Sequence, residues 1–396
     1  MHKAFVEVPS NLISGATLRF IGYDDVTASK LWLRWINWPS DPPLREVDDS
    51  DHGMPFIEFA KGRIEGRDDA VEDDDATWHA CFNVCGISRS TQNAIMDPVY
   101  RRVRLTRSCL FWIEDTMETR YRTLQSMQRA SRGREMALER ARSQPSGSAS
   151  TTNQAVSFSS HGGRRSISST QQEDVGLEAD TAMSARALAA QNAQGFTLLW
   201  KGISQLYLDG LFDSNGNVVG ISRLVSLPQT DFCRGPAFYF VVDRDIAVYY
   251  ANYAKRRANY SSAVLVRIAI PNPAIEGMSS TERLTVYWPS EEWKELVFRS
   301  RRFNPYPSHL RKYKQATLII GSIAGKPTPL FVNMDSPSQI TEPMVLKNAA
   351  GQHAVQYVWP LEPAGEDFLL EHGAPHLKVY HLTREENEAW EAAHQA

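Results

Sequence analysis

Residues 143–180 constrain the fold of this 396-residue chain more than any other stretch. They consist mainly of Ser, Thr, Gln and Gly, with few apolar side chains. Such a segment buries too little apolar surface to offset the entropy lost on ordering. We therefore predict a disordered linker at 143–180, which limited proteolysis should cut first. It would separate a domain at 1–142 from a second domain at 181–396, and each is long enough to form its own core.

The first domain is predicted to be mainly helical. After an extended entry at 5–20, apolar residues recur at helical spacing in four segments. These are a helix after Asp24 and Asp25, one at 54–64, one from Asp74 or Asp75 to Cys85, and a long one that begins near Leu110.

The second domain is predicted to be rich in strands. After a helix at 182–194, apolar runs predict strands at 197–200, 237–242, 263–271, 316–323, 354–359 and 377–382. Lys201 and Gly202 would end the first strand, and Asp243 would cap a helix whose apolar residues recur through Tyr253. A charged helix or tail ends the chain. The fold class is therefore α+β.

Composition narrows the class of protein. The net charge is −3, which argues against nonspecific coating of nucleic acid. No run approaches the roughly 20 apolar residues of a spanning helix, and the N-terminus has no apolar signal-peptide core, so we expect a cytoplasmic protein without a membrane partner. Four cysteines do not form a disulfide framework. We expect Cys81 and Cys85 to be buried thiols and expect no metal site. Common nucleotide-hydrolase and α/β-hydrolase motifs are missing from the sequence.

The segment from Phe196 to Leu382 resembles the ADP-ribosyltransferase fold. In that family the first core strand ends in His-Gly or Arg-Gly, where this chain has Lys201-Gly202, and the second carries an aromatic pattern, here Phe238-Tyr239. A Glu-x-Glu strand ends the family's core, and residues 365–373 (GEDFLLEHG) match it best. The resemblance implies that NAD is the cofactor, with Tyr239 on the nicotinamide, Lys201 toward the ribose or phosphates, and Asp367 at the oxocarbenium-like centre. Lys201, Gly365 and Asp367 differ from the family's residues at these positions, so the resemblance supports the family's fold more strongly than its activity.

Residues 299–314 combine basic and aromatic side chains. Guanidinium groups pair with phosphates and aromatic rings stack on unpaired bases, so this stretch is a candidate surface for tRNA or another polyanion. The alternative is a solvated loop with local ion pairs to Glu291, Glu292 and Glu295. Residues 100–107 are a weaker second candidate. The predicted contacts in the first stretch are Arg299, Arg301, Arg302, Arg311, Lys312 and Lys314.

Asp68, Asp69 and Glu72 form a D-D-x-x-E motif in an acidic run. If Glu72 lay one helical turn after an aspartate, the carboxylates would bind a cation or shift one another's pKa. The motif resembles that of fungal arginine-containing cyclodipeptide synthases, which join two tRNA-borne amino acids into a ring. The resemblance implies a cofactor-independent enzyme whose partners are Arg-tRNA and a second aminoacyl-tRNA. Its carboxylates would pair with the arginine guanidinium and deprotonate the attacking α-amine.

Three hypotheses follow: a tRNA-dependent cyclodipeptide synthase using Asp68, Asp69 and Glu72; an NAD-dependent ADP-ribosyltransferase using Lys201, Tyr239 and Asp367; and a catalytically silent module that binds a nucleotide or protein. We favour the first, because it gives both the acidic and the basic clusters a use.

Overall fold

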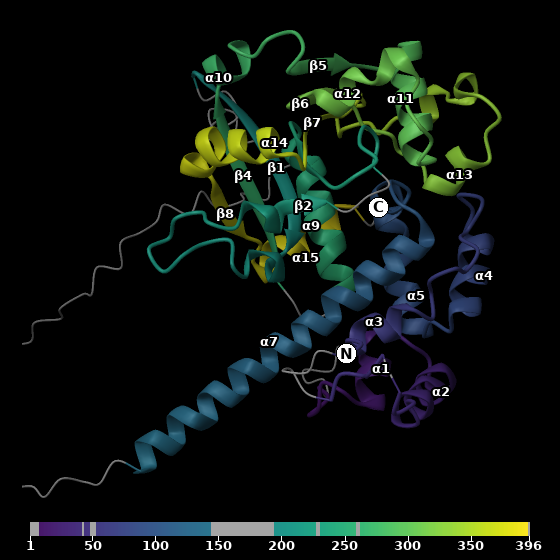
Figure 1. Cartoon of the computed structure of the whole chain (residues 1–396), viewed down its shortest axis with the longest axis vertical. Helices are drawn as coiled ribbons and strands as arrows, with labels where there is room; N and C mark the ends of the chain where they lie inside the picture. The colour runs from purple at the N-terminus through teal and green to yellow at the C-terminus, as the bar shows by residue number, and fades with distance from the viewer. Residues whose placement is uncertain are drawn as a thin grey trace, which may run out of the picture.

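The computed structural model describes residues 8–41, 43–47, 53–143, 194–226, 230–258 and 262–394. It confirms an α+β fold with a helical N-terminal region and a C-terminal mixed sheet of eight strands with helices (Figure 1). The predicted linker at 143–180, apart from Ser143, lies outside the described residues, as does nearly all of the helix expected at 182–194.

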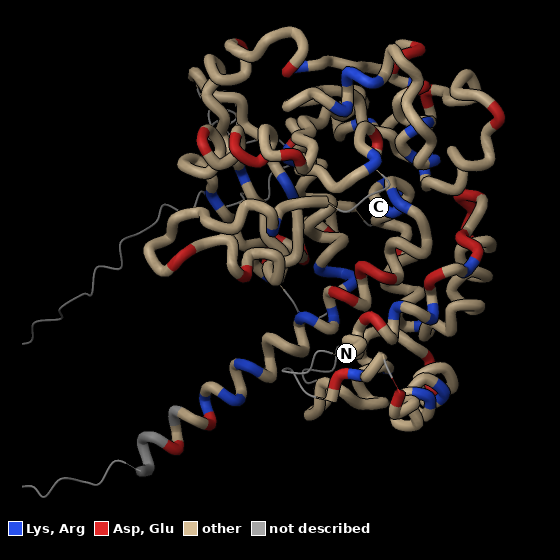
Figure 2. The backbone as a smooth tube through the Cα atoms, viewed as in Figure 1, with Lys and Arg blue, Asp and Glu red and all other residues tan. Residues whose placement is uncertain are grey.

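The N-terminal region contains short helices around one long one. Asp24 and Asp74 cap their helices as predicted, because their carboxylates accept hydrogen bonds from backbone amides of the first turn. The C-terminal half of α7 extends past the other elements and carries several basic side chains (Figure 2). The elements are α1 (Gly15–Ile21), α2 (Asp25–Ile36), α3 (Phe56–Lys61), α4 (Asp75–Cys85), α5 (Arg89–Ile95), η1 (Pro98–Tyr100), α6 (Arg101–Arg104) and α7 (Cys109–Ser143).

The C-terminal sheet has the order β5-β6-β7-β3-β1-β4-β8, and β2 pairs with β3. Only the pair β5–β6 is parallel among the described strands. The longest pairing joins β1 to β4 over nine residues each, which places two apolar strands at the centre of the core. The strands are β1 (Phe196–Ser204), β2 (Val225–Ser226), β3 (Ala237–Val241), β4 (Ala263–Pro271), β5 (Arg283–Val286), β6 (Leu318–Ser322), β7 (Val355–Pro360) and β8 (Lys378–His381).

Helices and turns cover this sheet and its edges. The α-helices are α9 (Arg244–Ala258), α10 (Asn272–Glu276), α11 (Glu291–Arg301), α12 (Lys312–Gln315), α13 (Thr328–Val332), α14 (Pro363–Phe368) and α15 (Arg384–His394). The short turns are η2 (Gln205–Leu208), η3 (Ile221–Leu224), η4 (Ser308–Leu310), η5 (Pro337–Gln339), η6 (Glu342–Met344), the π-helical η7 (Leu369–Gly373) and η8 (Ala374–His376).

Helix α9 packs against β1 because Gly202 leaves room for its backbone. A Cβ atom on Gly202 would lie 1.9 Å from the carbonyl oxygen of Ala247 and 2.6 Å from the amide nitrogen of Ala251. Only glycine permits so close an approach of strand and helix.

The opposite side of α9 joins the sheet to the helical region. Tyr249 and Tyr253 belong to the same apolar cluster as the N-terminal helices. Tyr253 donates a hydrogen bond to the carbonyl of Ile95 at 3.0 Å, and Arg257 pairs with Asp115 of α7 at 2.5 Å. The helical and sheet regions therefore share one buried junction. The exact boundaries of the two predicted domains stay a prediction.

Three local expectations are wrong. The first strand does not end at Lys201-Gly202 but continues to Ser204, because β4 pairs with it along its whole length. Residues 15–21 form α1 rather than an extended entry, since Ser14 caps them. The GEDFLLEHG segment forms α14 and η7 rather than a strand, because its apolar residues Phe368 and Leu369 pack on the sheet from outside it.

Candidate functional site

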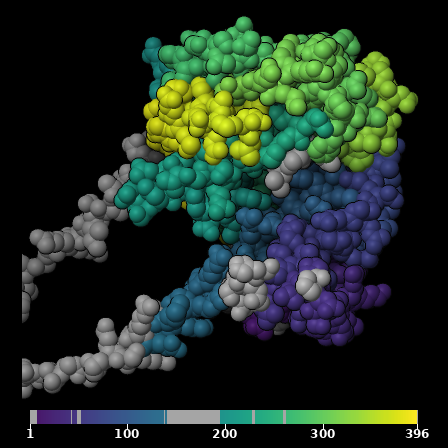
Figure 3. Space-filling model, in the orientation of Figure 1, coloured from purple at the N-terminus to yellow at the C-terminus, as the bar shows by residue number. Residues whose placement is uncertain are grey.

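A cavity of about 1010 Å³ lies between the helical region and the sheet. Its walls come from α3, the loop before α4, the N-terminal half of α7, strands β1 and β3, and helix α9. Figure 3 shows the surface hollowed where the blue helical part meets the teal part of the chain. A volume of this size is typical of a site for a small molecule or for one end of a larger one.

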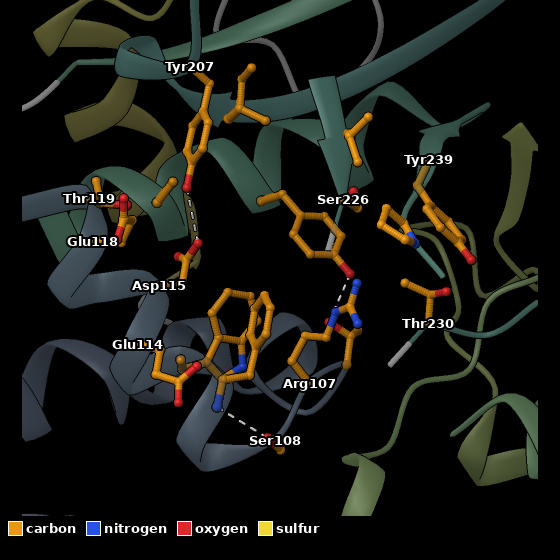
Figure 4. Close-up of a pocket in the computed structure, with 18 of the residues that line it drawn as sticks. Arg107, Ser108, Glu114, Asp115, Glu118, Thr119, Tyr207, Ser226, Thr230 and Tyr239 are labelled. Atoms are coloured by element: carbon orange, nitrogen blue, oxygen red, sulfur yellow. Dashed lines mark hydrogen bonds between the residues drawn. The ribbon is translucent and has the colours of Figure 1, made fainter. Parts of the chain in front are cut away.

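Three carboxylates of α7 line this cavity away from Arg107. Figure 4 shows Glu114, Asp115 and Glu118 of α7 on one side, and Arg107 with Ser226 on the other. Lys61, Arg122 and Arg257 also line the acidic side, where they pair with Glu118 and Asp115, so Glu114 is the carboxylate of α7 that offers unpaired negative charge to a ligand.

Lys201 is the most perturbed basic group of the cavity. Burial, together with the nearby positive charge of Arg107, lowers the pKa of Lys201 to about 7. Its Nζ donates hydrogen bonds to Ser226 Oγ at 2.8 Å and to the carbonyl of Tyr239 at 3.2 Å. No carboxylate of the described residues forms an ion pair with it. A large fraction of this amine is thus neutral at physiological pH and able to accept a proton.

A buried ion pair fixes the basic side of the cavity. Arg301 Nη2 lies 2.5 Å from Asp231 Oδ1, and both side chains are at most 4% exposed. Arg301 also donates to the carbonyl of Thr106 at 3.0 Å, which ties the residue before Arg107 to α11. Burial and the Arg301 charge lower the pKa of Arg107. This network therefore holds the backbone next to Arg107, while Lys201 is held separately by Ser226 and Tyr239.

Glu114 is the carboxylate of α7 whose pKa is raised. Burial raises its pKa, and the charges of Glu65, Asp69 and Glu58 add to the rise against the opposing effect of Lys61. Within the described part of the chain it has no hydrogen-bond or ion-pair partner. Its neighbours on α7 differ.

Asp115 and Glu118 already have cationic partners. Asp115 pairs with Arg257, and Glu118 pairs with Lys61 at 3.3 Å and with Arg122 at 2.8 Å. A half-buried carboxylate without a partner is the group that a cationic ligand stabilises most, which sets Glu114 apart from both.

The structure brings one residue of the D-D-x-x-E motif to the cavity. Asp69 lines it, while Asp68 and Glu72 are exposed on a loop that is not helical. Asp69 Oδ1 accepts hydrogen bonds from the amides of Ala70 at 2.8 Å and Leu110 at 3.2 Å, so it holds the first turn of α7. Burial raises the pKa of Asp69. The catalytic role of all three residues stays a prediction.

The alternative set is also divided. Lys201 and Tyr239 both line the cavity. Asp367 is exposed on α14 and is not among the cavity residues.

The basic stretch 299–314 divides between structural and exposed cations. Arg301 is buried, as described above. Arg302 donates to the carbonyls of Phe331, Val332 and Met334 at the end of α13. Arg299 pairs with Glu295, and Lys312 with Glu292, as the alternative of local ion pairs expected.

Arg311 and Lys314 are exposed, like Lys312, but line a pocket. They line a second pocket of about 710 Å³ together with Arg234, Tyr306 and Glu362. The predicted polyanion surface therefore narrows to this pocket.

The four cysteines are buried free thiols, as expected for Cys81 and Cys85. Asp69, Cys81 and Cys109 place possible metal-ligand atoms within 4.8 Å of one another. The Asp69 carboxylate already accepts a hydrogen bond from the amide of Leu110 in α7. Burial raises the pKa of Cys109. The pKa of Cys81 is raised by the hydrogen bond between Cys81 and Cys109. Each of the three groups already has a hydrogen-bond partner in the described structure.

Sequence reasoning missed Glu114 and Ser226. Glu114 lies on the predicted long helix, four residues before Glu118, and that spacing is a weak signal that both share a face. Nothing in the local sequence marks Ser226, because its contact with Lys201 joins residues 25 positions apart.

No described helix is both long and apolar enough to cross a membrane. Comparison with models of protein families, with curated proteins and with solved structures finds no match for this chain.

Proposed function

We propose that this protein is an aminoacyl-tRNA-dependent synthase that forms an arginine-containing cyclic dipeptide. The observation that carries the proposal is the cavity, which is lined both by Glu114, a carboxylate without a partner among the described residues, and by Lys201, whose pKa is lowered to about 7. An arginyl ester on tRNA has matching parts: a cationic guanidinium, a reactive carbonyl, and a polyanionic carrier.

In this proposal the guanidinium of the arginyl group binds at Glu114. Guanidinium and carboxylate form two parallel hydrogen bonds, which are stronger when both groups are desolvated. Glu65 and Asp69 contribute negative charge nearby. Asp69 also fixes the start of α7, five residues before Glu114. We assign no contact with the arginyl group to Asp68 and Glu72, whose side chains are exposed.

Lys201 accepts a proton during acyl transfer in this proposal. An amine with a pKa near 7 combines a large neutral fraction with useful basicity at neutral pH. The α-amine that attacks an aminoacyl ester must lose a proton as the peptide bond forms. Arg107, whose charge lies close to Lys201, favours the negative charge that develops on the carbonyl oxygen.

The phosphates of the tRNA bind at the second pocket in this proposal. Arg234, Arg311 and Lys314 supply three cations there against one acid, Glu362. Phosphate contacts of this kind position a nucleic acid without reading its sequence.

Product analysis tests the proposed function. An expressing host should accumulate an arginine-containing cyclic dipeptide, detected by mass spectrometry. Glu114→Gln should lower its formation by about 10²–10⁴-fold, because it removes the carboxylate that binds the arginyl guanidinium. Asp69→Asn should also lower it, because Asp69 holds the start of α7 and adds negative charge near Glu114. Asp68→Asn and Glu72→Gln are matched controls and should lose less. A host that makes no such product but consumes NAD would contradict the proposal.

A salt titration tests the second pocket. Arg311→Ala with Lys314→Ala should weaken tRNA binding and reduce the slope of log affinity against log salt by about 2, since two phosphate contacts release fewer counterions. Lys312→Ala is the control, because Lys312 is already paired with Glu292. An unchanged slope would remove this pocket from the tRNA interface.

The ADP-ribosyltransferase alternative is less well supported. Lys201 and Tyr239 share the cavity, but the exposed Asp367 on α14 is not part of it. The carboxylate that this alternative assigns to the reaction centre is therefore in the wrong place for it.

A further inference from the structure

Ser226 and Lys201 form a close pair in the wall of the cavity. Lys201 extends from β1, and Ser226 ends β2, which pairs with β3 at Ala237. Lys201 Nζ lies 2.8 Å from Ser226 Oγ, and the other hydrogen-bond partner of Nζ is the carbonyl of Tyr239. The pairing of β2 with β3 and of β3 with β1 holds both residues on one sheet.

This arrangement has the parts of an activated nucleophile. A serine hydroxyl is a weak nucleophile until a base within about 2.6–3.2 Å removes its proton. Lysine serves as that base in Ser-Lys sites, provided that it is held neutral. The half-buried amine of Lys201 meets this condition, because it lies near the Arg107 charge and is paired with no carboxylate of the described residues.

We propose that Ser226 is the nucleophile of this site and carries the acyl group as a covalent ester, with Lys201 as its base. This inference rests on the proposed function for the identity of the acyl group, which is arginyl. The reactivity of Ser226 is inferred from the structure independently of the proposed function.

The first step moves the acyl group from tRNA to the enzyme. The neutral Lys201 amine takes the proton of Ser226 Oγ, and Oγ attacks the carbonyl carbon of the aminoacyl ester. The bond between that carbon and the ribose oxygen breaks. The ribose oxygen takes the proton from the Lys201 ammonium, which leaves an arginyl ester on Ser226 and a free tRNA end.

The second step forms the peptide bond. The α-amine of the second aminoacyl group attacks the Ser226 ester carbonyl, so a carbon–nitrogen bond forms while the bond to Oγ breaks. Lys201 takes the proton that the amine loses and returns it to Ser226 Oγ. This restores Ser226 and leaves a dipeptide that is still esterified to the second tRNA. The free arginyl α-amine then attacks that ester carbonyl, so a second carbon–nitrogen bond forms while the bond to the ribose oxygen breaks. The proton that the amine loses passes through Lys201 to the ribose oxygen, which releases the cyclic dipeptide and the tRNA. No oxidant, reductant or cofactor is needed.

The first experiment measures the reactivity of the serine without any arginyl substrate. The full chain is incubated with a fluorophosphonate, which phosphonylates activated serine hydroxyls with loss of fluoride, and the intact mass and the modified peptide are determined. We expect one adduct, at Ser226. Ser226→Ala should give none, and Lys201→Met should slow labelling by about 10²–10⁴-fold.

Ser222→Ala is the matched control, since Ser222 is an exposed serine on η3 in the same wall. It should be labelled at Ser226 at the wild-type rate. No adduct on the wild-type protein, or equal labelling of Ser226→Ala, would overturn the proposal.

The second experiment separates this inference from the proposed function. Acid-quenched reactions with Arg-tRNA should show the mass of one arginyl group on the wild-type protein and none on Ser226→Ala. If Ser226→Ala makes the cyclic dipeptide at the wild-type rate, the proposed function stands and Ser226 is not the nucleophile. If the fluorophosphonate labels Ser226 but no arginyl product forms, the nucleophile stands and the proposed function fails.

Discussion

At the scale of single residues, the site depends on what surrounds each ionisable group. Lys201 and Glu114 are shifted in opposite directions by the same cause, since burial disfavours the charged form of both. Like charges nearby reinforce each shift: Arg107 acts on Lys201, and Glu65 acts on Glu114. Groups whose environments push their pKa values toward neutrality are candidates for proton transfer.

The pH dependence of activity should report Lys201. A base must be neutral to act, and the lowered pKa of about 7 means that Lys201 is mostly protonated below that pH. We therefore expect kcat/KM to fall about tenfold per pH unit below about pH 7 and to level off above it. Steady-state assays from pH 5.5 to 8.5 would measure this limb.

Arg107→Gln provides the control for this assignment. Removing a neighbouring positive charge raises the pKa of Lys201, so the limb should move to higher pH. If the fall in kcat/KM occurs at the same pH in Arg107→Gln as in the wild type, a group other than Lys201 causes it.

The sequence predicted part of this site for a physical reason. Lys201 directly follows an apolar run and Tyr239 lies within another, so both positions are visible in a local pattern. Glu114, Ser226 and the burial of Arg301 depend on contacts between distant segments, which composition does not record. The run of basic residues therefore suggested a binding surface, although four of its six predicted cations (Arg299, Arg301, Arg302 and Lys312) already have partners within the protein.

At the scale of elements, helix α9 controls where the site residues lie. One of its faces packs on β1 at Gly202 and another joins the apolar cluster of the helical region. A shift of α9 would thus move the strand that carries Lys201 relative to the helix that carries Glu114.

The capped helices α2 and α4 and the apolar strand β4 were predicted well because local signals decide them. The short strands β2 and β5 were not, since pairing with a neighbour creates them.

Gly202→Ala should destabilise the protein by about 1–3 kcal/mol. The added methyl group meets backbone atoms of Ala247 and Ala251, which move only if α9 moves. Chemical denaturation would give the free energy of unfolding.

Gly133→Ala is the control with the opposite expected sign. Gly133 lies on an exposed part of α7 with no atom near a new Cβ, so this change should stabilise the protein by up to about 1 kcal/mol. Equal effects of the two changes would contradict the packing argument.

At the scale of the whole molecule, the buried Arg301–Asp231 pair connects several separate elements. Asp231 also accepts hydrogen bonds from Gln356 of β7 at 2.8 Å and from the amide of Ala324 at 2.9 Å. Arg301 reaches Thr106 of the helical region. This pair fixes the sheet, α11 and the basic side of the cavity relative to one another.

Asp231→Asn should lower the free energy of unfolding by about 3–5 kcal/mol, because it leaves the Arg301 charge buried without its partner. Arg384→Gln, which breaks a pair whose side chains are 81% and 60% exposed, should change it far less, because water screens an exposed pair. Thermal or urea unfolding of both variants would compare them. A loss in Asp231→Asn no larger than in Arg384→Gln would show that the network is not what holds these elements together.

The sharing of α9 between both regions has a consequence for synthesis on the ribosome. The apolar cluster of the N-terminal helices is completed by Tyr249 and Tyr253, which follow α7 by roughly a hundred residues. At about 5–20 residues per second, the nascent helices wait for roughly 5–20 seconds with that apolar face uncovered. During this interval the emerging chain is a substrate for chaperones, and a messenger truncated after α7 would yield a product that aggregates rather than a smaller folded protein.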